Sequence, residues 1–124
     1  MAASAERLQD FARQFGILDT DAFVQTMETL DRTGRLPSRY LTKGEAEATG
    51  WKPGQDLWRK APGKSIGGDG FANRERLLPG GLRYIEADLD YRGGPRNAKR
   101  LIVASNGRRW ITVDHYQSFH EVPQ

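Results

Sequence analysis

The sequence predicts an α+β domain in which N-terminal helices pack on a twisted antiparallel β-sheet. Apolar residues recur with helical spacing in the first third of the chain and alternate with polar residues in the last third. The 14 glycines, 6 prolines and 37% hydrophobic content fit a turn-rich domain better than a helical bundle. A chain of 124 residues is long enough for one such domain with a single core.

Two helices are predicted before residue 35. Residues 6–15 carry one apolar stripe with helical spacing, made of Leu8, Phe11, Ala12 and Phe15. A second helix is expected to begin after Asp19 or Thr20 and to stop at Gly34. Its apolar face carries Phe23, Met27 and Leu30. Both stripes indicate core packing rather than a cofactor site.

A third, shorter helix is predicted after residue 42. Thr42 and Glu45 have the spacing of a capping box, in which each side chain accepts a hydrogen bond from the other residue's backbone N–H. Gly50 is a typical stop for such a helix. Residues 52–81 are rich in glycine, proline and charge, and we expect loops there with one short helix or strand.

The glycines of APGKSIGGDG, residues 61–70, raise the question of a phosphate-binding loop. Such a loop needs a glycine five positions before its Gly-Lys-Ser, and this chain has Trp58 at that position. No parallel strand–helix–strand pattern surrounds the stretch. We therefore expect a tight multi-turn loop whose glycines adopt positive φ, and not a nucleotide site.

The sheet is predicted in the second half of the chain. Residues 82–91 alternate, with Tyr84, Glu86 and Asp88 on one side and Ile85, Ala87 and Leu89 on the other. Residues 100–105 and 108–113 are rich in strand-forming side chains and flank Asn106-Gly107. An Asn-Gly pair between two such runs is a strong hairpin signal.

Charge is distributed unevenly along the chain. Residues 1–31 contain two basic and six acidic groups, a net charge of −4, whereas residues 32–124 have a net charge of +7. A basic body with interspersed aromatic residues is typical of a protein that binds a polyanion. An ordinary surface rich in lysine and arginine is the alternative, and charge alone leaves both open.

Several site chemistries are excluded by composition. The chain has no cysteine, which removes disulfides, thiolate catalysis and cysteine-ligated zinc. Its two histidines, His115 and His120, lie five residues apart and do not form a zinc arrangement, so we expect no metal and no cofactor. We recognise no signal peptide and no membrane span, although a mature secreted protein could have lost its signal.

Three polar features remain as candidates for chemistry. Glu86 is either a solvated strand carboxylate or a general base on the concave face of the sheet. Arg96 and Arg100 are either ordinary surface charges or a pair that binds phosphate oxygens. His115, in the run VDHYQSF, places an imidazole, a side chain that exchanges protons near neutral pH, in a segment rich in aromatic and polar residues.

Five blocks of sequence, met in order along the chain, resemble the barnase/binase family of small bacterial guanyl-preferring ribonucleases. The blocks are LTKGEAEATGW, APGKSIGGDGFANRE, YIEADLDY, RNAKRLI and DHYQSF. The match runs from about Asp21 to Val122 and divides the chain into an N-terminal helical extension, residues 1–20, and one compact ribonuclease domain, residues 21–124. The extension could belong to a larger toxin polypeptide or be variation within the family.

The resemblance implies an endoribonuclease that works without a metal. It would cleave single-stranded RNA 3′ of guanosine by transesterification to a 2′,3′-cyclic phosphate, which is then hydrolysed. Glu86 matches the family's general base for the ribose 2′-OH, and His115 matches the general acid for the departing 5′-oxygen. Three cations match the cluster that stabilises the transition state: Arg96, Arg100 and Lys43.

The resemblance also implies a guanine site in FANRE and its neighbours. Glu75 would accept hydrogen bonds from guanine N1 and N2. Guanine O6 would be bound by the backbone amides around Ala72, Asn73 and Arg74. Phe71 and Tyr116 match apolar and stacking groups at the base. Pro95 departs from the family pattern, because the best-known members have there an aromatic that flanks guanine.

The resemblance further implies a partner, an acidic barstar-like protein inhibitor, and secretion or delivery as a toxin domain. Nothing in the sequence indicates more than a monomer. A catalytically weak RNA-binding domain of the same fold is the competing interpretation. A binding module needs the cations but has no use for the pair Glu86 and His115, so the enzyme is favoured.

Overall fold

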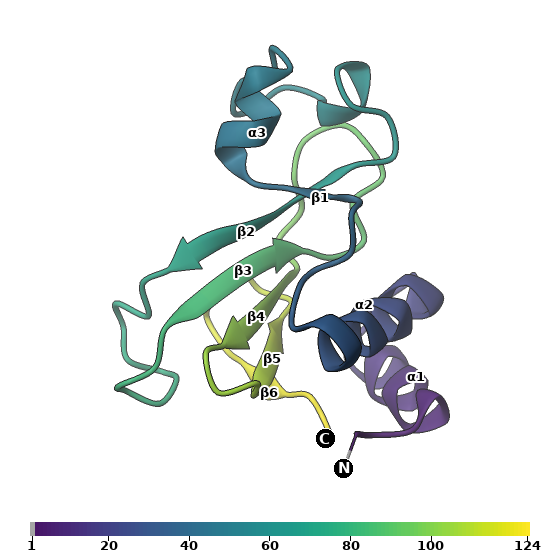
Figure 1. The fold of residues 1–124 in the computed structure, drawn as a ribbon, viewed down its shortest axis with the longest axis vertical. Helices are drawn as coiled ribbons and strands as arrows, with labels where there is room; N and C mark the ends of the chain where they lie inside the picture. Colours follow the sequence, from purple (N-terminus) through teal and green to yellow (C-terminus); the bar gives the residue numbers. More distant parts are fainter. Residues whose placement is uncertain (1) are drawn as a thin grey trace.

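The computed structural model describes residues 2–124 and has helices and a mostly antiparallel sheet (Figure 1). The elements are α1 (Ala5–Gln14), α2 (Thr20–Thr33), β1 (Tyr40–Leu41), α3 (Lys43–Ala48), the 3-10 helix η1 (Leu57–Arg59), β2 (Ser65–Phe71), β3 (Tyr84–Asp88), β4 (Arg100–Ala104), β5 (Arg109–Thr112) and β6 (His120–Glu121). The strands lie in chain order; β1 and β2 are parallel and every other neighbouring pair is antiparallel. The predicted α+β class is confirmed.

The helices begin and end where their capping residues predict. The Asp19 side chain accepts a hydrogen bond from the N–H of Ala22 at 3.0 Å and starts α2, and Gly34, at φ 73°, ends that helix. Thr42 and Glu45 form the predicted capping box at the start of α3. These helix boundaries are encoded by residues within one turn of each end.

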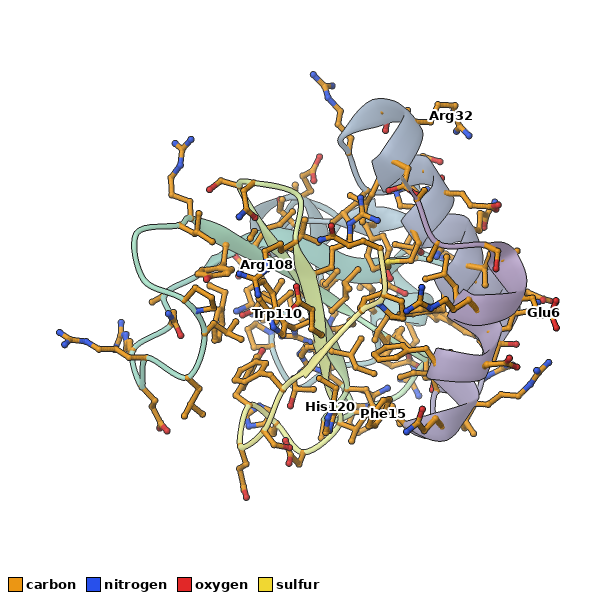
Figure 2. All side chains as sticks on the ribbon, turned by 90° about the horizontal axis from the view of Figure 1, so that it is seen from below. Glu6, Phe15, Arg32, Arg108, Trp110 and His120 are labelled. Atoms are coloured by element: carbon orange, nitrogen blue, oxygen red, sulfur yellow. The ribbon has the colours of Figure 1, made fainter. Side chains whose placement is uncertain are left out.

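The main core lies between α1, α2 and one face of the sheet. The helices contribute Leu8, Phe11, Phe23, Met27 and Leu30, and the sheet side contributes Ala87, Leu89, Leu101, Ile111 and Val122. Phe15, just after α1, stacks on the ring of His120 at the start of β6, with centroids 4.1 Å apart (Figure 2). The described part of the N-terminal extension, residues 2–20, thus supplies core contacts, while its boundary with the ribonuclease domain at residue 20 stays a prediction.

The glycine-rich stretch at residues 61–70 is a correction to the sequence analysis. Most of it forms β2, which pairs with both β1 and β3, and not the expected multi-turn loop. Gly67 has ordinary φ but no room for a side chain, because an added Cβ would lie 2.5 Å from Tyr40 Cδ1 and 2.9 Å from Ala87 Cβ. Gly68, at φ 106°, lies where the register with β3 shifts, which is a β-bulge.

Gly67→Ala should destabilise the protein by about 1–3 kcal/mol, because the new methyl group must displace the Tyr40 ring or separate β2 from β3. Gly70→Ala is the matched control, since an added Cβ at Gly70 meets no atom within 4 Å. Urea unfolding of both variants measures the difference. Equal unfolding midpoints would contradict the close approach at Gly67.

The alternation predicted for residues 82–91 is confirmed, although the strand is shorter than expected. β3 ends at Asp88, and Asp90 turns the chain with φ 56°. Its face opposite α1 and α2 carries Tyr84 in a second apolar cluster with Leu78, Ile102, Ala104 and Trp110. The hairpin between β4 and β5 is also confirmed, with Gly107 at φ 91°. None of the helices in residues 2–124 combines the length and apolar character needed to cross a membrane.

Candidate active site

Glu86 lies at the centre of the sheet, on the face opposite α1 and α2. In β3 it is paired with Asp69 of β2 and with Ile102 of β4. Its side chain is half-buried, and the hydroxyl of Tyr116 donates a hydrogen bond to Glu86 Oε1 at 3.0 Å. Burial, and then the neighbouring Glu86 charge, raise the pKa of Tyr116 to about 12. The phenol therefore stays protonated and serves as a fixed donor to the carboxylate.

His115 lies in a tight turn after β5 and not on a strand. His115 and Tyr116 both have positive φ, 55° and 73°. The Asp114 carboxylate stabilises the turn by accepting hydrogen bonds from the N–H groups of Gln117 and Ser118 at 3.1 and 3.0 Å. The His115 side chain is exposed, and its ring centroid lies 4.8 Å from that of Tyr116. Tyr116 thus connects the predicted acid with the predicted base.

The turn should lose stability in acid through Asp114. Hydrogen bonds, above all from the Ser118 hydroxyl, lower the pKa of Asp114 from 3.8 to about 2. Because this pKa is lower in the folded protein, the stabilisation is full above 3.8 and is lost as the pH falls toward 2. We expect the stability difference between wild type and Asp114→Ala to shrink over that interval in pH-dependent urea unfolding.

Asp10→Ala is the control for this experiment, because within residues 2–124 the Asp10 side chain makes only an exposed contact with Arg13, 3.5 Å away. Its stability difference from wild type should stay small at every pH. A difference for Asp114→Ala that does not change between neutral pH and pH values near the folded pKa would contradict the role of the Asp114 carboxylate.

Arg96 and Arg100 converge on one buried carboxylate, that of Asp88. Arg96 binds it with two hydrogen bonds, Nε to Oδ2 and Nη2 to Oδ1, each 2.7 Å long. Arg100 Nε lies 3.1 Å from Asp88 Oδ1. The side chain of Arg100 is 4% exposed and that of Asp88 is 2% exposed, so the interpretation of the arginines as ordinary solvated surface charges is wrong.

Asp88 was not assigned a role from the sequence, although its place in the alternation puts it on the same face as Glu86. Its two hydrogen bonds with Arg96 and its ion pair with Arg100 hold both guanidinium groups beside the centre of the sheet. The hydrogen bonds with Asp88 also raise the pKa of Arg96, so this cation keeps its charge at any pH at which the protein is folded.

Lys43 lies at the edge of the site, at the start of α3. Its backbone N–H donates to Asp69 Oδ2 at 2.9 Å, and Asp69 is paired in register with Glu86. The Lys43 side chain is exposed and free to meet a ligand. The structure therefore places the start of α3 next to β2, the strand whose Asp69 pairs with Glu86 of β3.

A pocket of about 270 Å³ opens beside Glu86. Its lining includes Glu86 and all six residues predicted for the base site: Phe71, Ala72, Asn73, Arg74, Glu75 and Tyr116. The rings of Phe71 and Tyr116 are stacked, with centroids 5.3 Å apart and an interplanar angle of 20°. Pro95 is not part of this lining.

Two residues of the pocket were missed in the sequence analysis. Phe119 lies 6.0 Å from Phe71, centroid to centroid, and Leu77 lines the pocket although its side chain is 53% exposed. Phe119 ends the DHYQSF block and could have been noticed as an aromatic neighbour of Tyr116. No pattern in the sequence distinguishes Leu77 from the buried Leu78 beside it.

Asn73 shapes the loop that follows β2. Its side chain accepts from the N–H of Leu78 at 3.2 Å and donates to the Leu78 carbonyl at 2.9 Å, which closes the loop. Figure 1 shows that this loop between β2 and β3 projects away from α1 and α2. Within residues 2–124 the N–H groups of Arg74 and Glu75 donate to no protein acceptor, so they remain available to a ligand in the pocket.

Comparison with known proteins identifies the family of this chain. A family model described as ribonuclease matches residues 24–123. The chain is 44% identical over 105 residues to a ribonuclease of Heyndrickxia coagulans, and the match covers 82% of this chain and 96% of that protein. It is also 44% identical over 105 residues to ribonucleases of Bacillus intermedius and Bacillus pumilus, and the match spans 65% of the length of each. Motifs, fold and relatives together show that the chain belongs to the barnase/binase family of bacterial ribonucleases.

Proposed function

We propose that this chain is an endoribonuclease that cleaves single-stranded RNA 3′ of guanosine through a 2′,3′-cyclic phosphate, without a metal. One observation carries the proposal: the pocket lined by all six residues expected at the base also includes Glu86 in its lining, and Tyr116 contacts both Glu86 and His115. A carboxylate and an imidazole on either side of a scissile phosphate form a general base and a general acid.

The first step is an attack within the ribose phosphate. Glu86 takes the proton of the 2′-OH, the 2′-oxygen forms its bond to phosphorus, and the bond from phosphorus to the 5′-oxygen breaks. His115 gives its proton to that departing oxygen. In the second step water attacks phosphorus and the bond from phosphorus to the 2′-oxygen breaks, with His115 now taking a proton from the water and Glu86 returning one to the 2′-oxygen. The Tyr116 hydroxyl holds the Glu86 carboxylate in orientation by its hydrogen bond at 3.0 Å.

Three cations are proposed to stabilise the negative charge that develops on the pentacoordinate phosphorus: Arg96, Arg100 and Lys43. Because Asp88 already holds both guanidinium groups, little reorganisation is needed when the charge develops. The planar guanidinium also matches two phosphate oxygens at once.

The guanine base is proposed to bind in the pocket beside Glu86. Glu75 would accept from guanine N1 and N2, the free N–H groups around Arg74 would bind O6, and the Phe71–Tyr116 stack would contact the base. A single-stranded substrate suits this site because its bases can leave their stack and lie against aromatic rings. DNA would bind without reacting, since it lacks the 2′-OH.

Cleavage of a short RNA with a single guanosine tests this function. We expect a cut 3′ of guanosine that leaves a cyclic phosphate, identified by mass spectrometry, and no cut when that guanosine carries a 2′-deoxy group. Cleavage after every base would overturn the guanine preference while leaving the chemistry intact. A folded protein that binds the RNA and cuts nothing would be the RNA-binding domain that the sequence left as an alternative.

We also propose an acidic, barstar-like protein inhibitor that covers this face. The charge of +7 over residues 32–124 supports it. Electrostatic steering of this kind is exemplified by barnase and its inhibitor, so the expected behaviour is transferred from that pair. Stopped-flow association rates with a candidate inhibitor should fall steeply as salt is added, and rates independent of ionic strength would contradict the proposal.

A further inference from the structure

The loop that carries Arg96 is bonded to the linker between α1 and α2, residues 15–19. The Asp90 carboxylate accepts from the N–H of Leu18 at 2.8 Å and from the N–H of Asp19 at 2.9 Å. Lys99 Nζ donates to Asp90 Oδ2 at 2.9 Å and to the carbonyl of Gly16 at 2.8 Å. Three of these bonds therefore join the two ends of this loop to a segment more than 70 residues away in sequence, and the fourth, from Lys99 to Asp90, joins the two ends to each other.

These bonds are not ordinary surface contacts. The side chain of Asp90 is 4% exposed and that of Lys99 is 22% exposed. Burial by itself raises the pKa of Asp90, but the bonds from Leu18, Lys99 and Asp19 outweigh it, and the pKa is lowered. The carboxylate is thus charged at neutral pH and satisfied by its partners.

The backbone in the middle of this loop is permissive, so the bonds at its two ends matter for its position. Gly93 and Gly94 have φ of 82° and 70°, between Asp90 and Arg96. Two adjacent glycines have few steric restrictions, so they transmit little order from one end of a loop to the other.

Residues 97–99 are the part of the loop that contacts the proposed catalytic groups. Arg100 Nη1 donates to the carbonyls of Asn97 and Lys99, at 2.6 and 2.9 Å. The carbonyl of Ala98 accepts from the backbone N–H of His115 at 3.1 Å. The position of these three residues therefore sets the positions of both Arg100 and the His115 turn.

We propose that Asp90 and Lys99 form a clamp that fixes residues 97–99 and so positions Arg100 and His115 for RNA cleavage. The proposal rests on the function proposed above and adds two positioning residues to it. In this proposal Lys99, which lies in the cationic run RNAKR, binds the α1–α2 linker and does not bind the phosphate.

Lys99→Met tests the clamp, with Lys99→Arg as the conservative variant that keeps the charge and the donors. Lys99→Met leaves the two backbone bonds of Asp90 intact, so the protein should still fold. Asp31→Asn is the control, because it breaks a different ion pair outside this loop, that of Asp31 in α2 with Arg109 in β5 at 2.8 Å. For each variant we would measure kcat and KM for RNA, and the affinities of guanosine 3′-monophosphate and of guanosine.

We expect Lys99→Met to lower kcat by roughly ten- to a hundredfold, the range for small misplacements of catalytic groups. Its affinity for guanosine 3′-monophosphate should fall while that for guanosine is unchanged, since only the phosphate site is disturbed. Lys99→Arg and Asp31→Asn should keep the wild-type kcat.

Two results would overturn the clamp. The first is a folded Lys99→Met protein with wild-type kcat and wild-type affinities for both ligands. The second is an equal loss of kcat in Asp31→Asn, because a general loss of stability would then account for both. A wild-type protein that does not cleave RNA would instead overturn the proposed function, and this proposal with it.

Discussion

Glu86→Ala and His115→Ala should each lower kcat for RNA cleavage by about 10²- to 10⁴-fold, the range for losing one general acid or base. Neither side chain supports the core: that of His115 is exposed, and within residues 2–124 that of Glu86 makes one hydrogen bond, with Tyr116. Both variants should therefore fold with near-native stability, and steady-state cleavage of the single-guanosine RNA measures the loss. The wild-type pH–rate profile should be bell-shaped, and each variant should lose one of its limbs.

Two control variants separate chemistry from structure. Tyr116→Phe keeps the ring stack with Phe71 and removes only the hydrogen bond to Glu86, so we expect a smaller loss of kcat than in Glu86→Ala. His120→Gln replaces the other histidine, which stacks on Phe15, and should leave kcat unchanged. If His115→Ala retained full activity with an unaltered pH profile, His115 would not be the general acid.

Asp88→Asn should cost about 3–5 kcal/mol of unfolding free energy, the range for removing one partner of a buried ion pair. The carboxylate is shared by Arg96 and Arg100, and Arg100 is nearly as buried as Asp88 itself. Its loss leaves a buried cation without its counter-charge, and it frees both guanidinium groups from their fixed positions. Activity of the folded variant should fall as well, since the proposed phosphate site is no longer preorganised.

Urea unfolding measures the change, with Glu121→Gln as the control. Glu121 binds Arg108 with two hydrogen bonds of 2.8 and 2.9 Å, but both side chains are 39% exposed. Exposed pairs of this kind contribute about 0–1 kcal/mol, so burial is the main difference between the two experiments. An Asp88→Asn protein as stable as Glu121→Gln would show that Asp88 does not hold the arginines.

Several elements could be predicted because a few neighbouring residues specify them. Asp19 and Gly34 delimit α2, and Thr42 with Glu45 starts α3, since each cap bonds within its own first or last turn. The β4–β5 hairpin follows from Asn106-Gly107 in the same way. The face of β3 that carries Glu86 follows from strict alternation in a strand.

Other features could not be read from local patterns. Gly67 reads as a loop residue until Tyr40 and Ala87 are seen to occupy the space of its missing side chain. Arg96 and Arg100 read equally as surface charges until Asp88, eight or more residues earlier, is found buried between them. Glycine occurs both in loops and where two backbones pack closely, and arginine occurs both on the surface and in buried ion pairs. Neighbouring residues in the sequence therefore do not decide between the two environments.

Local sequence patterns predict the α+β class, the helix boundaries, the hairpin and, through the motifs, the residues that line one face of the sheet. The folded structure was needed to see that β2 is a strand, that Leu77 and Phe119 line the pocket, and that Asp90 and Lys99 bind the α1–α2 linker. The difference lies in the range of the interactions. Caps, turns and alternation are satisfied within a few residues, whereas close packing and shared charges depend on segments that meet only in the folded chain.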